Sequence, residues 1–156
     1  MNNIYKAPQA DLHIGPSAEE LRKRPLLVWI ISIFYGFSAI ITPFSFYAIK
    51  SGMLPLTIAH EQYFASLGAI DWLMNALNAL VILSAAVSLF LLKRVTTKFW
   101  GISVATVMLN HIYHIFAKNW LGTVPISGQI AASFGFAVLL AVFFYVKRLA
   151  ARGVLK

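Results

Sequence analysis

Four long runs without a charged residue limit this chain to very few folds. They cover residues 26–49, 72–92, 99–117 and 119–146, and a helix needs about 20 apolar residues to cross the hydrocarbon core of a bilayer. The third run is the weakest because it is the shortest and contains Asn110, His111 and His114. We therefore expect an all-α membrane protein, a four-helix transmembrane bundle with spans at about 26–49, 71–92, 99–117 and 127–146.

Composition points to the same class of protein. Of the 156 residues, 60% are hydrophobic and 12% are charged, whereas a soluble domain has about 45–50% apolar and about 25% charged residues. A buried hairpin in a soluble protein could explain one such run, but four runs leave too few polar residues to cover them. We expect residues 1–25 to form a cytoplasmic arm with a short juxtamembrane helix, residues 26–146 the membrane domain, and residues 147–156 a basic cytoplasmic tail.

The net charge of +8 indicates how the chain is threaded through the membrane. All of the 13 Lys and Arg residues except Lys50 and Lys118 precede the first run, separate the second from the third, or follow the fourth. Short basic loops stay in the cytoplasm, so we expect both termini inside and no nucleic acid as a partner. Eight basic residues are expected to form a rim that contacts anionic lipid headgroups: Arg22, Lys23, Arg24, Lys93, Arg94, Lys98, Lys147 and Arg148.

Polar residues on two of the predicted spans should meet at the same depth. Asp71, Asn75 and Asn78 are spaced four and three residues apart, which places them on one stripe of a helix. The next span carries Asn110, His111 and His114, and the tight basic turn makes the two spans antiparallel neighbours. Polar side chains in a membrane face the interior and are candidates for function. Three interpretations stay open: hydrogen bonds across the hairpin, a site for a proton, metal or small ligand, or contacts to another subunit.

No motif for catalysis accompanies this cluster. The chain has no Cys, and it contains no Ser nucleophile motif, phosphate loop or carboxylate pair. We therefore expect no enzyme activity and predict no cofactor, while haem and metal stay open. Two His residues three apart on one helix cannot hold one haem from opposite sides, so bis-His ligation would need His60 or another chain. A divalent metal would need Asp71, His111 and His114 as ligands.

Small residues recur along one side of the fourth predicted span. Ser127, Ala131 and Gly135 are spaced by four, and Gly128 and Ala132 form an adjacent row. Small residues at this spacing let membrane helices approach closely. We expect this face to pack against another helix, either within the chain, in a homo-oligomer or in a partner protein.

Two loops face the outer side in this topology. In the longer one, the spacing of Ile58, Phe64, Leu67 and Ile70 predicts a helix lying on the membrane surface. The loop over residues 118–127 contains Gly122 and Pro125 and is expected to be a simple turn.

The N-terminus carries a recognisable pattern. The sequence Asn3-Ile4-Tyr5-Lys6-Ala7-Pro8-Gln9-Ala10-Asp11-Leu12 resembles the Asn-x-Tyr-x-Ala-Pro-x-Ala-type start of many small, mostly uncharacterised proteobacterial inner-membrane proteins. The resemblance covers about ten residues. It implies a bacterial cytoplasmic membrane and a cytoplasmic N-terminus, and it supplies no catalytic residues.

Two functions follow from these features as expectations. The first is a non-catalytic accessory protein that binds a membrane-protein partner through helix packing, for example a guard protein against a pore-forming toxin. The second is a protein that binds or transports a small ligand, metal or proton through the cluster of Asp71, Asn75, Asn78, Asn110, His111 and His114.

Overall fold

Helices make up most of the part of the chain that the structure describes. The computed structural model describes residues 25–54 and 58–156, and this part of the chain contains no strand. Its helices are α1 (Leu26–Lys50), α2 (Ile58–Ala65), α3 (Ala69–Phe90), α4 (Thr96–Ala117), α5 (Trp120–Thr123) and α6 (Ile126–Ala151). The N-terminal motif, the predicted juxtamembrane helix and the basic residues Arg22, Lys23 and Arg24 lie outside the described residues.

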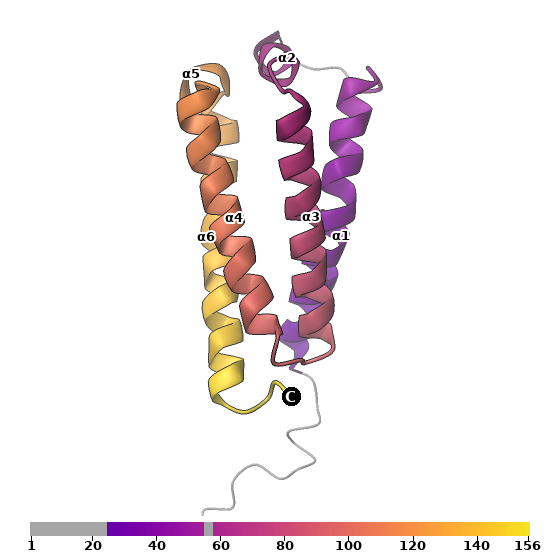
Figure 1. The fold of residues 1–156 in the computed structure, drawn as a ribbon, viewed down its shortest axis with the longest axis vertical. Coiled ribbons are helices and arrows are strands. Elements are labelled where there is room, and N and C mark those ends of the chain that lie inside the picture. The colour runs from indigo at the N-terminus through magenta and orange to yellow at the C-terminus, as the bar shows by residue number, and fades with distance from the viewer. Residues whose placement is uncertain (1–24, 55–57) are drawn as a thin grey trace, which may run out of the picture.

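The long helices contact one another in chain order. Helix α1 lies against α3, α3 against α4, and α4 against α6, while the short helices α2 and α5 touch each other at one end (Figure 1). We call this the α2/α5 end. The turn between α3 and α4 and the last residues of the chain lie at the opposite end (Figure 1). We call that end the basic end because Lys93, Arg94, Lys98, Lys147 and Arg148 are exposed there.

Three of the described helices, α1, α3 and α6, are long and apolar enough to cross a membrane. They cover the first, second and fourth predicted spans. Helix α4 does not reach the same hydropathy because it begins with Thr96, Thr97 and Lys98 and carries polar residues near its other end. By length and composition, then, the structure supports a membrane protein, and the fourth span stays a prediction.

The best-buried side chains lie near the basic end. Trp100 of α4 is 0% exposed and meets the ring of Tyr35 of α1 edge-on, with 4.9 Å between ring centroids. All four long helices and the C-terminal segment contribute to this core, which includes Val28, Ile31, Ala85, Ala86, Leu89, Leu139, Val142, Val146, Leu149 and Leu155. The long helices are thus held together at the end opposite α2 and α5.

The last residues of the chain close the basic end. The Lys156 N–H donates to the carbonyl of Leu92 at 2.7 Å, and the Arg94 N–H donates to the carbonyl of Lys156 at 2.8 Å. Leu155 is buried between these contacts and the core. The segment after α6 therefore ties α6 to the α3–α4 turn.

Both loops at the α2/α5 end differ from expectation. The predicted surface helix corresponds to α2, which ends at Ala65. Gly68 caps the next helix, and α3 begins at Ala69. Leu67 and Ile70 are therefore not part of the surface helix. The expected simple turn contains the single helical turn α5. Asn119 starts that turn in a left-handed conformation, with φ of 47°, which Asn tolerates better than most residues.

The small residues of α6 divide into two rows. Ser127, Ala131 and Gly135 are exposed, and a Cβ added at Gly135 would meet nothing within 4 Å. Gly128 and Ala132 are half-buried and face the interior. Within the described part of the chain, the exposed row therefore packs against no other helix.

Candidate functional site

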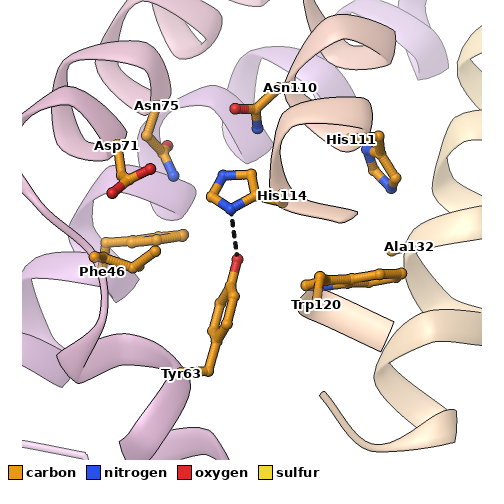
Figure 2. A pocket seen from close by; sticks show the side chains of 10 residues that line it. Phe46, Tyr63, Asp71, Asn75, Asn110, His111, His114, Trp120 and Ala132 are labelled. Carbon is orange, nitrogen blue, oxygen red and sulfur yellow. Dashed lines mark hydrogen bonds between the residues drawn. The ribbon is translucent and has the colours of Figure 1, made fainter. Parts of the chain in front are cut away.

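A cavity of about 130 Å³ lies at the α2/α5 end between the α1/α3 and α4/α6 pairs. It is partly open to the surface and is lined by Phe46, Tyr63, Leu67, Asp71, Asn75, Asn110, His111, His114, Trp120 and Ala132. Five of the six residues in the predicted polar cluster are among them. Figure 2 shows these polar side chains approaching from α3 and α4, with the rings of Phe46 and Trp120 on opposite sides.

Asp71 is fixed at the first turn of α3. Its Oδ2 atom accepts a hydrogen bond of 2.7 Å from the Gly68 N–H, which satisfies one free amide at the helix start. The same oxygen forms an ion pair with Lys118 Nζ at 3.1 Å. Lys118 also donates to the carbonyl of Ser66 at 2.8 Å. Lys118 therefore connects the end of α4 to the segment that joins α2 and α3.

Tyr63 of α2 provides a second connection across the cavity. Its hydroxyl shares a hydrogen bond of 3.2 Å with His114 Nδ1 (Figure 2). Burial, together with the negative charge of Asp71, raises the pKa of Tyr63 to about 12. The hydroxyl therefore keeps its proton at physiological pH. This bond holds His114 in place at the cavity.

Several polar atoms around the cavity lack a partner among the described residues. Asp71 Oδ1 and His111 Nε2 are both buried without a hydrogen bond. The side chains of Asn75 and Asn110 line the cavity and are half-buried. Buried polar atoms in proteins are almost always satisfied by protein, water or ligand, so this site is suited to hold a molecule with hydrogen-bonding groups.

A second cavity of about 280 Å³ adjoins the first one on the side of the basic end. Asn75, Asn110 and His111 line both cavities. Asn78 lines only the second, where its Oδ1 accepts a hydrogen bond of 2.8 Å from the Thr106 hydroxyl. Asn78 is therefore the one member of the predicted cluster with a protein partner and no contact with the first cavity.

The described side chains do not assemble a metal centre. No three His, Cys, Asp or Glu residues within residues 25–54 and 58–156 are grouped so that they could hold one metal ion. His114 instead bonds Tyr63, and His111 lies against the rings of Trp120 and Phe136. The combination of Asp71, His111 and His114 considered for a divalent metal is thus not formed in this structure.

Residues outside the predicted polar cluster also shape the site. Phe46, Tyr63 and Trp120 line the cavity, and Lys118 compensates Asp71 from outside it. One signal for Lys118 was present in the sequence, since it is one of only two basic residues on its side of the predicted membrane. No comparable pattern marks the three aromatic residues, because they come from three separate helices.

Comparisons with known proteins add no information about the function of this site. No protein-family model, no curated protein and no solved structure matches this chain.

Proposed function

We propose that this protein is a four-span protein of the bacterial inner membrane that binds a small polar molecule in the cavity between α3 and α4. The observation that carries the proposal is the cavity itself, where polar side chains from two helices surround buried atoms without partners. Polar side chains inside a membrane are costly in free energy, and they commonly mark functional sites. The cavity therefore favours the ligand-binding function over the accessory function expected from helix packing alone.

The proposed membrane arrangement has support from helix order and charge. Helix α4 lies between α3 and α6 and has the same length as α3, 22 residues. We place the basic end in the cytoplasm because basic loops stay there, and its exposed Lys and Arg side chains then contact anionic headgroups. The cavity lies at the other end and opens to the outer side. The N-terminal resemblance adds support for the inner membrane.

The core near the basic end makes binding a better proposal than a channel. Trp100, Leu89 and Val146 are fully buried there and belong to a packed core between the cavity and the basic end. A ligand entering at the α2/α5 end would therefore stop in the polar half of the molecule. The ligand would enter and leave the protein from the same side of the membrane.

The exposed row on α6 supports a second, compatible function. Ser127, Ala131 and Gly135 face outward and pack against no described helix of this chain. Such rows allow close approach of a second membrane helix. We propose that this row contacts another copy or a partner membrane protein, which are two of the three possibilities left open by the sequence.

The binding function can be tested by filling the cavity. Ala132 lines the cavity on α6, whereas Ala137 is exposed on the same helix. Small polar fragments detected by ligand-observed NMR on the protein in nanodiscs should bind the wild type and Ala137→Phe but not Ala132→Phe. Only Ala132→Phe places a ring in the cavity, so only this variant should lose binding. Equal binding to both variants, or no binding to any form, would refute the proposal.

A further inference from the structure

The unpaired atoms of the cavity restrict what kind of ligand it can take. Asp71 Oδ1 is a pure acceptor and is buried without a partner. His111 Nε2 lies on the opposite side of the cavity, also unpaired, and can donate or accept depending on its tautomer. The amides of Asn75 and Asn110, which also line the cavity, can both donate and accept. A ligand must therefore bring at least one N–H or O–H donor for Asp71.

The charge of the site is already balanced. Asp71 is 4% exposed at its side chain and carries the one formal charge of the cavity lining, and Lys118 pairs with it at 3.1 Å. Lys118 also donates a hydrogen bond to the carbonyl of Ser66. A charged ligand would add an uncompensated charge to a partly buried site, which is costly. An uncharged ligand avoids that cost.

The walls of the cavity favour a flat molecule. Phe46 and Trp120 lie on opposite sides of it, and Tyr63 lies between them (Figure 2). Aromatic side chains stabilise a second ring by stacking or edge-to-face contact. The cavity of about 130 Å³ limits the ligand to a small ring with one polar substituent.

We propose that the ligand is an uncharged, donor-bearing planar molecule, such as a small aromatic amide, and that the Asp71–Lys118 ion pair sets this preference. The inference rests on the proposed function and specifies its ligand class. In this role Asp71 contacts the ligand through Oδ1, while Lys118 acts only by neutralising Asp71.

The test uses three probes of nearly equal shape: benzamide, benzylammonium and benzoate. Their dissociation constants are measured by ligand-observed NMR on the full chain in nanodiscs at about pH 8, where an ordinary histidine is neutral, with empty nanodiscs as the control for lipid partitioning. For the wild type, benzamide should bind roughly tenfold or more tightly than either charged probe.

Charge variants make the test specific to the ion pair. Lys118→Gln leaves the Asp71 charge uncompensated and should shift the preference to benzylammonium. Asp71→Asn leaves the Lys118 charge and should shift it to benzoate. The double variant Asp71→Asn/Lys118→Gln is neutral again and should return the preference to benzamide, while Lys118→Arg should behave as the wild type. The thermal unfolding midpoint of each variant verifies that it is folded.

The outcomes separate the two levels of the proposal. Binding of benzylammonium or benzoate to the wild type as tight as that of benzamide overturns the assignment of an uncharged ligand and leaves the binding function standing. A preference that stays the same in all folded charge variants also overturns the role of the ion pair. Saturable binding of none of the three probes to any variant overturns the proposed function together with this inference.

Discussion

Trp100→Ala is expected to lower the free energy of unfolding by about 3 kcal/mol, near the lower end of the range for large aromatic side chains in protein cores. Trp100 is 0% exposed and lies where all four long helices meet. Its ring packs edge-on against Tyr35, and Ala would leave a cavity that the surrounding helices cannot close. The lower end applies because lipid chains offer apolar contacts to separated helices, so only packing is lost.

The measurement is reversible unfolding by sodium dodecyl sulfate in mixed micelles, followed by far-UV circular dichroism. Trp29→Ala is the matched control, since Trp29 is 41% exposed and its removal should cost far less. Trp100→Phe keeps a ring against Tyr35 and should cost about 1 kcal/mol. A Trp100→Ala variant as stable as Trp29→Ala would contradict the core described here.

Lys118→Ala is expected to lower the free energy of unfolding by about 2 kcal/mol, less than the 3–5 kcal/mol for breaking a fully buried ion pair. Asp71 would stay buried with only the Gly68 N–H as a partner for its charge. The reduced figure reflects the position of Lys118, whose side chain is 19% exposed and leaves water a path to the carboxylate.

A double-mutant cycle separates this ion pair from other effects of the substitutions. Asp71→Asn/Lys118→Gln should recover most of the stability lost in Lys118→Gln, because the remaining Asn can still accept the Gly68 bond. The same unfolding assay gives the coupling energy. If the single and double variants are additive, Asp71 and Lys118 do not stabilise each other and the neutral site proposed above loses its basis.

The bounds of the long helices follow closely from the charge-free runs. The predicted spans 26–49 and 71–92 correspond to α1, Leu26–Lys50, and α3, Ala69–Phe90. The other two helices extend beyond their predicted bounds: α4 already begins at Thr96, and α6 continues to Ala151 through Lys147, which is a good helix former. Absence of charge marks what can lie in lipid, whereas helix ends depend on local hydrogen bonds at the turns.

The polar cluster could be found from spacing, but its surroundings could not. Helical periodicity placed Asp71 and Asn75 on one stripe, and the short turn made α3 and α4 neighbours. Tyr63 and Trp120 reach the cavity only because α2 and α5 fold over this end of the molecule. Their position depends on the path of two irregular loops, which no periodic pattern describes.

The small residues of α6 show a similar limit. Their spacing correctly marks a face with little side-chain bulk, but it carries no direction. Which row faces inward depends on how α6 rotates against α4, and in the structure Gly128 and Ala132 face inward while Ala131 faces outward.

In the proposed arrangement, a water-accessible pocket opens at the α2/α5 end and is closed toward the basic end. The chain has no Cys, so single cysteines report on each position directly. Asn110 lines the cavity, its neighbour Leu109 is exposed on the surface of α4, and Ser103 is buried nearer the start of α4. A thiol reacts as its thiolate, which forms in water and not in lipid or a packed core.

The decisive measurement is the rate of N-ethylmaleimide labelling of single-cysteine variants in intact membranes. Asn110→Cys should react roughly tenfold or more faster than Leu109→Cys and Ser103→Cys, because only its thiol faces water. Prior treatment with a membrane-impermeant thiol reagent from the outer side should prevent the labelling of Asn110→Cys. The same treatment should not prevent the labelling of Val95→Cys, which lies in the α3–α4 turn. Asn110→Cys that reacts as slowly as Leu109→Cys, or that is protected only from the cytoplasmic side, would contradict the account.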